Sequence, residues 1–299
     1  MSTSSLAASL PSAWFSQSAP WASLAASTAA AGIVGVVEPA FWQGQPRTQS
    51  ATFIDYFDSL IGWERFRASQ FGIRHYCTIG INPKECNDRQ MAEEVLKILP
   101  RYCQKDGVVA VGEIGYDDIT ENEEYFFAAQ MEVAKDLDLP ILIHTPHRDK
   151  KVGTERTMAL IREVGVKEEM VLVDHLNEIT LPIVLESDCW RGHSVYPHTK
   201  MSEERMVALL KQYGTEKMVV NSAADWGRSD PLKVPKTGEL MLEEGFTPDI
   251  VHKVLFENPI EFYAQSGKIS LEEVKRPVID QTKLFENNSV LRGQTPIVE

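Results

Sequence analysis

Short apolar runs rich in β-branched residues alternate with stretches of helical periodicity, and this alternation restricts the fold more than any other feature of the sequence. Several runs are continuously apolar, which is typical of strands in a parallel sheet that is covered on both faces. They recur at intervals of about 20 to 40 residues, the rhythm of repeated βα units. Seven segments fit and predict strands: 32–40, 74–82, 107–116, 139–146, 170–177, 189–197 and 217–225.

The intervals between these runs carry helix signals. Apolar residues at helical spacing follow Thr120, which together with Glu123 has the pattern of a capping box. Segments 202–214 and 247–259 are similar, and Pro248 occupies a position that favours the start of a helix. The sequence therefore predicts strand–helix units rather than a purely β or purely helical domain.

This pattern predicts an α/β fold, a (β/α)8 TIM barrel whose first strand is degenerate or replaced and which carries a C-terminal arm. The alternative is an open doubly wound sheet. The Gly-rich phosphate loop that often opens such a sheet is missing, because "GEIG" is too short to serve as one. A barrel needs eight strands, so the eighth has to precede residue 33.

The N-terminal segment, residues 1–31, is mostly Ala and Ser and lacks the basic start of a secretory signal and the arginines of a transit peptide. We expect it to be poorly ordered, apart from a short helix in "LAASTAAAG". Residues 32–266 form the expected barrel. The polar tail, residues 267–299, is an expected arm against the barrel or a partner.

Composition excludes some classes of protein. The net charge of −13 argues against binding duplex DNA by neutralising its phosphates, but not against a nuclease whose metal ions carry the positive charge. No apolar stretch reaches the length of a membrane span. The cysteines show neither a CxxC pair nor zinc-ribbon spacing, which favours reduced thiols in a cytoplasmic protein. They are Cys77, Cys86, Cys103 and Cys189.

Polar residues at strand ends are the candidates for chemistry, because the functional groups of a βα barrel lie at the C-terminal ends of its strands. Glu113, His144 and His175 end three consecutive predicted strands. Two imidazoles and a carboxylate suit Zn, Mn or Fe, and a bound divalent ion lowers the pKa of water to about 7. Asp225, at the end of the last predicted strand, is the candidate general base and a further ligand.

Each candidate has a structural alternative. Glu113 can pair with an arginine across the barrel, the two histidines can cap their strands, and Asp225 can cap a turn. Glu38 is expected to order its own loop rather than to bind metal, and His193 is expected to line the substrate site. His75 and His252 are assigned to packing.

Four residues are candidate substrate contacts near the same strand ends: Trp42, His147, Arg148 and His198. His147 and Arg148 can hold an anionic group or can be solvated loop residues. Together with the acidic net charge, these residues favour a compact anionic or polar substrate over a long polymer.

Four motifs give a more specific indication: "VGEIGYD" (111–117), "LPILIHTP" (139–146), "VLVDH" (171–175) and "ENPIEFY" (257–263). In order and spacing they resemble the TatD family of metal-dependent hydrolases, TIM-barrel members of the amidohydrolase superfamily. The resemblance implies that Glu113 bridges two divalent ions, that His144 and His175 bind the second ion, and that a last-strand aspartate is ligand and proton acceptor. It implies metal-assisted hydrolysis, often of phosphodiesters.

The chain departs from this family pattern in two places. The first strand of the family ends in an HxH pair that binds the first ion, whereas no histidine here precedes His75. In "NSAAD", Asp225 lies two residues later than the pattern requires. We therefore expect one ion more readily than two. Unless the N-terminal stretch supplies a strand, we also expect unpaired sheet edges that lower stability or promote association of chains.

Three functions remain open from the sequence. The first is a TatD-like hydrolase that uses one or two divalent ions, with Zn favoured and Mn, Mg or Fe as alternatives. The second is a catalytically impaired barrel that serves as a binding or scaffold subunit, since the HxH pair is missing. The third is a hydrolase of a small metabolite rather than of nucleic acid.

Overall fold

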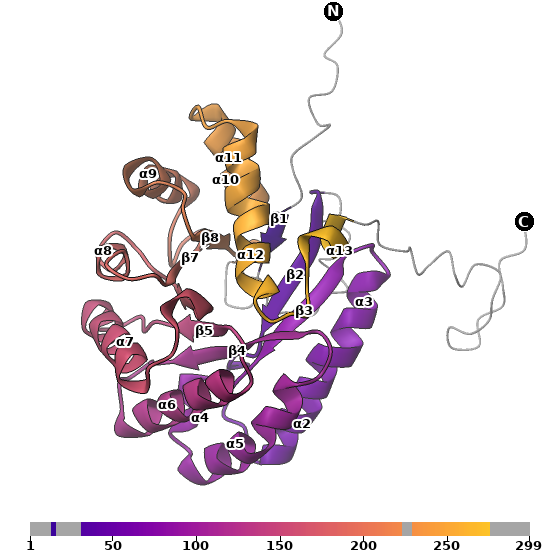
Figure 1. Cartoon of the computed structure of the whole chain (residues 1–299), viewed down its shortest axis with the longest axis vertical. Coiled ribbons are helices and arrows are strands. Elements are labelled where there is room, and N and C mark those ends of the chain that lie inside the picture. The colour runs from indigo at the N-terminus through magenta and orange to yellow at the C-terminus, as the bar shows by residue number, and fades with distance from the viewer. Residues whose placement is uncertain (1–12, 16–30, 223–228, 276–299) are drawn as a thin grey trace, which may run out of the picture.

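A computed structural model of the chain describes residues 13–15, 31–222 and 229–275. All its strands run parallel in one curled sheet, in the order in which they occur in the chain (Figure 1). The seven predicted strands are all present, each shorter than its apolar run. The strands are β1 (Ala13–Phe15), β2 (Ile33–Pro39), β3 (Arg74–Ile79), β4 (Val108–Gly115), β5 (Ile141–His144), β6 (Val171–Asp174), β7 (Trp190–Ser194) and β8 (Met218–Asn221).

Helices fill the intervals between the strands. The predicted capping box is confirmed, because Thr120 and Glu123 bond reciprocally at the start of α6. The helices are α2 (Ser50–Asp58), η2 (Ser59–Glu64), α3 (Arg65–Ser69), α4 (Pro83–Cys86), α5 (Arg89–Cys103), α6 (Glu121–Asp136), α7 (Lys150–Val164), η3 (Glu168–Met170), α8 (Leu181–Val184), α9 (Glu203–Tyr213), α10 (Lys233–Glu243), α11 (Pro248–His252), η4 (Lys253–Glu257), α12 (Asn258–Ala264) and α13 (Leu271–Lys275).

The N-terminal segment contributes one short strand before residue 33, the part of the chain in which the eighth strand was expected, although the sequence did not show which residues form it. β1 pairs with β2 in parallel, with Trp14 opposite Gly35 and Phe15 opposite Val36. The edge of β2 is therefore covered over these few residues. Within the described part of the chain no ladder joins β8 to β1, so the sheet is curled but not closed by hydrogen bonds. The predicted helix in "LAASTAAAG" falls almost wholly outside the described residues.

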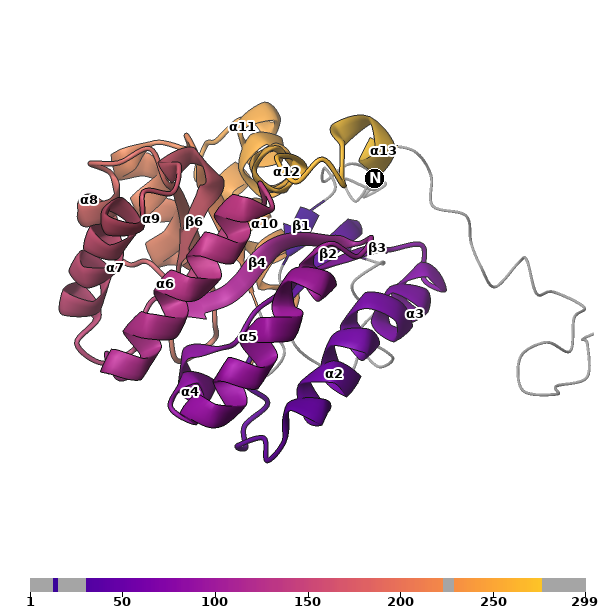
Figure 2. The ribbon, with the colours of Figure 1, turned by 60° about the horizontal axis from the view of Figure 1, so that its bottom comes forward.

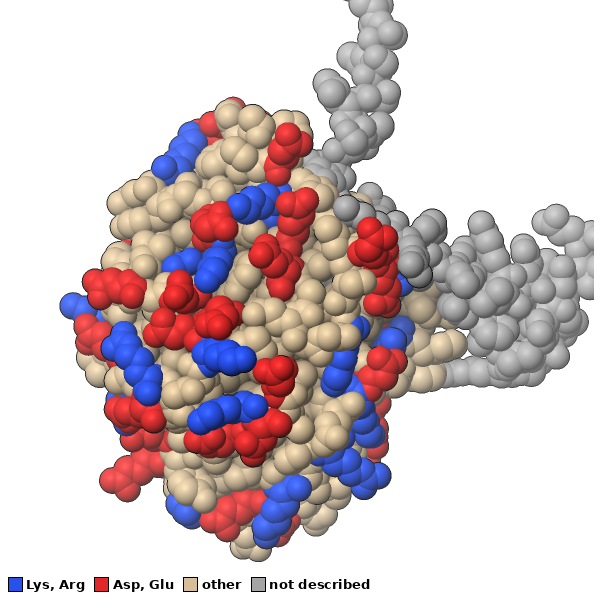
Figure 3. All heavy atoms as spheres, in the orientation of Figure 1, with Lys and Arg blue, Asp and Glu red and all other residues tan. Residues whose placement is uncertain are grey.

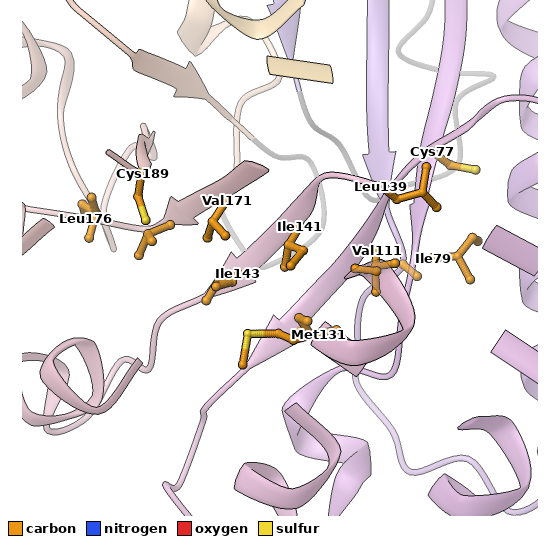
Figure 4. Close-up of a cluster of buried hydrophobic side chains, with 14 of the residues drawn as sticks. Cys77, Ile79, Val111, Met131, Leu139, Ile141, Ile143, Val171, Leu176 and Cys189 are labelled. Carbon is orange, nitrogen blue, oxygen red and sulfur yellow. The ribbon is translucent and has the colours of Figure 1, made fainter. Parts of the chain in front are cut away.

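One face of the sheet packs against a layer of helices. Val111, Ile141, Ile143 and Val171 lie on neighbouring strands, with Met131 of α6 against them (Figure 4). Because side chains alternate between the two faces of a strand, the residues between these positions point to the opposite, concave face. The four cysteines are buried and unpaired.

The concave face is covered by the C-terminal part of the chain. Leu142, Leu172 and Val219 of the sheet form a second apolar cluster with Phe262 of α12 and Val274 of α13. Figure 2 shows α12 and α13 on the side of the sheet opposite α2, α5 and α6. The first residues of the expected arm, up to residue 275, therefore pack on the sheet, and the rest of the tail lies outside the described residues. No helix in the described ranges has the length and apolar character needed to cross a bilayer.

A buried ion pair fixes the loop that follows β2. Arg47 contacts Glu85 of α4, and their side chains are 7% and 3% exposed. The guanidinium also lies over the rings of Phe53 and Tyr56, at 4.5 and 4.6 Å from their centroids. Burial raises the pKa of Glu85 to about 7, and the charge of Arg47 opposes this shift. The loop that carries Trp42 is thus tied to the helix layer.

The substitution Arg47→Met is expected to lower the free energy of unfolding by about 3 kcal/mol, because it leaves the buried carboxyl group of Glu85 without its partner. Urea denaturation followed by circular dichroism measures the change. Arg148→Met is the control, since that side chain is 83% exposed and its loss is expected to change stability by less than about 0.5 kcal/mol. Equal stability of the two variants would show that the pair does not hold the loop.

Candidate metal centre

Three polar side chains meet where consecutive strands end. Glu113 lies near the end of β4, His144 is the last residue of β5, and His175 follows β6 directly. Their candidate ligand atoms all lie within 4.8 Å of one another. Parallel pairing causes this convergence, because it aligns the ends of neighbouring strands, with Gly115 opposite His144 and His144 opposite Asp174.

One carboxylate oxygen of Glu113 is shared by both histidines. Its Oε1 lies 3.1 Å from Nδ1 of His144 and 3.0 Å from Nε2 of His175. The other oxygen, Oε2, accepts a hydrogen bond from Nδ2 of Asn82 at 3.1 Å. Burial opposes ionisation of Glu113, but His144 and then His175 outweigh it and hold its pKa well below the usual value. The group is therefore a carboxylate at neutral pH.

Asp174 orients His175. The backbone N–H of His175, which has a φ of 63°, donates to Oδ1 of Asp174 at 2.6 Å. The Nδ1 atom of His175 lies 2.6 Å from Oγ of Ser194 and 3.5 Å from Oδ2 of Asp174. Asn221 in turn donates to both oxygens of Asp174 at 2.9 Å. Burial and then Lys200 lower the pKa of His175 to about 4, so its imidazole is neutral at pH 7.

The donor set fits a divalent ion. Nε2 of His144 is buried and has no hydrogen-bond partner among the described residues, so a lone pair or an N–H is left unsatisfied unless a ligand occupies it. Ligands at about 2.1 Å from one ion lie about 3 to 4 Å apart, which is compatible with the spacing of the three residues. Two imidazoles and one carboxylate are a set that Zn, Mn and Fe accept.

The other candidate residues differ in their contacts with the three-residue centre. The ring of His147 lies 6.4 Å from that of His144 and 6.5 Å from that of His175. Trp42 lies under the ammonium group of Lys84, at 5.2 Å. The other two, Arg148 and His198, are exposed, and no hydrogen bond or ring contact in the described residues links them to the three-residue centre. Asp225, the candidate base and ligand, lies outside the described residues.

Two further strand-end residues have buried contacts of their own. The Oε2 of Glu38, which is not among the three candidate ligands, lies 2.8 Å from Nε2 of the buried His75 on the next strand. His193 is fully buried, and its Nδ1 lies 3.2 Å from the carbonyl oxygen of Leu176.

Sequence reasoning missed the residues that support the centre, namely Asn82, Asp174, Ser194 and Asn221. For Asp174 a signal was present. Leu172 points to the concave face, so the period of two places Asp174 on the same face, where a carboxylate is otherwise costly. Asn82 and Asn221 give no comparable signal, because asparagine is also common in turns and loops that follow strands and have no functional role.

Comparison with known proteins identifies the family. A family model described as "TatD related DNase" matches residues 64–276, more than half of the chain. The chain belongs to the TatD-related DNase family. An uncharacterized metal-dependent hydrolase of Methanocaldococcus jannaschii is 28% identical over 211 residues, which span 71% of this chain and 82% of that relative. This TatD protein is accordingly of the metal-dependent hydrolase type.

Solved structures support the same assignment. A TatD-like protein from Archaeoglobus fulgidus superposes with a TM-score of 0.69 at 26% identity, over 84% of this TatD chain and 99% of that one. A phosphotriesterase homology protein from Escherichia coli has a TM-score of 0.60 at 15% identity, over 85% of this chain and 99% of that one, a likeness of fold alone. Both indicate a fold of the TIM-barrel type.

Gly192 on β7 is a close-packing point beneath the centre. A Cβ atom there would lie 2.5 Å from Oδ1 of Asp174 and 2.9 Å from its Cα. Gly192→Ala is therefore expected to lower the free energy of unfolding by about 1–3 kcal/mol and to weaken metal binding, because the strand and Asp174 have to move. Urea denaturation and a zinc titration measure the two effects.

Gly62→Ala is the matched control for this substitution. No atom lies within 4 Å of the added Cβ, and the backbone is helical, so a gain of about 0.4–1 kcal/mol is expected. Unchanged zinc affinity in Gly192→Ala would contradict a role of Asp174 in holding His175.

Proposed function

We propose that this TatD protein binds one divalent ion through Glu113, His144 and His175 and hydrolyses a phosphoester of a small anionic substrate. Zn is the favoured ion, with Mn, Mg or Fe as alternatives. The convergence of the three ligand atoms at the ends of consecutive strands is the observation that carries the proposal. The unpartnered, buried Nε2 of His144 adds to it, because a buried imidazole nitrogen without a partner is unfavourable unless it binds a ligand.

The residues of the chain have separate roles in this proposal. When bound, the ion supplies Lewis acidity, which lowers the pKa of water to about 7 and polarises a phosphoryl oxygen. Asn82 holds the second oxygen of Glu113, so that the carboxylate stays in place. Asp174 and Ser194 fix the ring of His175. Asp225 accepts the proton from the attacking water.

We assign to the substrate side the residues that lie at the same end of the sheet, Trp42, His147, Arg148 and His198. The charge of the molecule favours a small substrate over duplex DNA. The net charge is −13, and acidic and basic side chains are intermixed on the face seen in Figure 3, without a continuous basic surface. A protein that approaches long polyanions usually offers such a surface.

The proposal extends to the architecture. We assign residues 32–266, together with the short strand β1, to a (β/α)8 barrel whose first strand is reduced. The rest of residues 1–31 is assigned to an atypical leading segment. Residues 267–299 are assigned to a C-terminal arm. Three residues of β1 provide few ladder bonds, and no ladder in the described residues joins β1 to β8, so the sheet is weakest on either side of β1.

Metal analysis tests the ligand set. Purified wild-type protein is expected to hold about one divalent ion per chain, and His144→Ala with His175→Ala is expected to hold almost none. Inductively coupled plasma spectrometry gives the content. His252→Ala is the control, because that histidine pairs with Glu257 at 3.2 Å and takes no part in the centre. Equal metal content in the double variant and the wild type would refute the assignment.

A specific feature also favours a second function, that of a catalytically impaired barrel acting as a binding or scaffold subunit. No histidine precedes His75, so the HxH pair that the family resemblance places on the first strand is missing. One ion held by three residues lacks the paired clamp on the attacking and leaving oxygens that a two-ion site provides.

A substrate panel separates these functions. Metal-dependent hydrolysis of small phosphoesters is expected, with weaker activity on single-stranded DNA and on lactones, and complete loss of activity after chelation. Release of phosphate or alcohol is measured for each substrate under identical conditions. Turnover of single-stranded DNA alone would contradict the small-substrate assignment, whereas no metal-dependent turnover of any of them would favour the scaffold function.

A further inference from the structure

Two lysines lie beside the candidate metal centre, and neither was singled out by the sequence. Lys200, in the loop after β7, places its Nζ 3.1 Å from Nδ1 and 3.3 Å from Nε2 of His175. Lys150 is the first residue of α7, directly after the loop that carries His147. Two ammonium groups at the end of a sheet that already collects metal ligands are unusual, because like charges repel each other and any bound cation.

Among the described residues no carboxylate pairs with Lys150, and the charge of Asp174 raises the pKa of Lys150 less than burial and Lys200 lower it. The Nζ atom of Lys150 donates to Oγ1 of Thr145 at 3.0 Å and to the carbonyl oxygen of Pro146 at 3.3 Å, both of them neutral groups. It forms no ion pair within the described residues. Burial, and then the charge of Lys200, lower the pKa of Lys150 to about 8. The hydroxyl group of Thr145 in turn donates to the carbonyl oxygen of Asp174 at 2.7 Å, so the ammonium group of Lys150 lies beside the strand end that carries His175.

The nearby carboxylates are already engaged. Glu113 contacts both histidines and Asn82, and Asp174 accepts two hydrogen bonds from Asn221. His147 adds no negative charge, because an imidazole ring is either neutral or positively charged. With a divalent ion on Glu113, the site would carry an excess of positive charge, which an anionic group with several oxygens compensates.

We propose that Lys150 and Lys200 form an oxyanion subsite that binds the phosphoryl group of the substrate next to the metal centre. The inference deepens the proposed function and rests on it for the identity of the cleaved bond. Binding of the anion itself requires no turnover. A lysine ammonium suits this role, since it is a compact point charge with three donors that serves phosphate in many sites.

Calorimetric titration of inorganic phosphate into the full-length chain tests the subsite. It is run at constant ionic strength, once after chelation and once with one equivalent of Mn²⁺. Lys150→Met and Lys200→Met are each expected to weaken phosphate binding by about tenfold or more, the loss of one charge-assisted hydrogen bond. Lys150→Arg, which keeps the charge, is expected to stay within about threefold of the wild type.

Lys151→Met is the matched control, because the neighbouring lysine is exposed and pairs with Glu155 at 3.8 Å. Its phosphate affinity is expected to equal that of the wild type. Circular dichroism and thermal unfolding show whether each variant is folded, and Lys150→Arg supplies a folded comparison if Lys150→Met is not.

The outcomes separate the subsite from the catalytic proposal. Phosphate affinity that falls in Lys150→Met and Lys200→Met while their metal content is unchanged supports the subsite, even if no substrate is hydrolysed. Phosphate affinity equal to that of Lys151→Met, a wild type that binds no phosphate in either condition, or a loss of phosphate binding that only follows loss of metal would each overturn it. The metal content of the histidine double variant decides the ligand set independently.

Discussion

The shared carboxylate of Glu113 is the interaction on which the rest of the centre depends. A carboxylate buried in an apolar sheet is stable only if its charge is compensated, and here two imidazoles and one amide do so through both of its oxygens. This requirement fixes where β4, β5 and β6 end relative to one another. It also explains why His175 adopts a left-handed backbone, since that conformation brings its ring to Glu113 while its N–H reaches Asp174.

The packing of the concave face determines which end of the sheet is available for chemistry. Aromatic residues of α12 fill this face, and burial, followed by the charges of Asp174 and Glu113, raises the pKa of the buried Tyr263. This apolar packing lies on the concave face of the sheet beside the polar centre, and a surrounding of low dielectric constant strengthens charge interactions. The opposite face is closed by the helix layer, so only the strand ends and their loops remain for a substrate.

The parts that were predictable from the sequence are those set by local pattern. Continuous β-branched runs gave the seven strands, Thr120 and Glu123 gave a helix start, and the rule that barrel chemistry lies at strand ends gave Glu113, His144 and His175. The rest depends on tertiary contacts. A three-residue strand such as β1 leaves too short a pattern to detect, and Lys200 reaches the centre only through the path of a loop. No local periodicity encodes that path.

The absence of the histidine pair and the presence of the two lysines both affect how much positive charge the site can offer to an anionic substrate, because the pair would hold a second ion. A second ion would have to be held by side chains, and none of the described residues outside Glu113, His144 and His175 forms such a group. Lysines add positive charge without requiring ligands, and they bind oxygens of a phosphoryl group. They cannot replace the ion in activating water, because an ammonium group does not act as a Lewis acid. Under the proposed function, the lysines therefore complement a single ion: the ion and Asp225 would serve the attacking water, and Lys150 and Lys200 would bind the anion that it attacks.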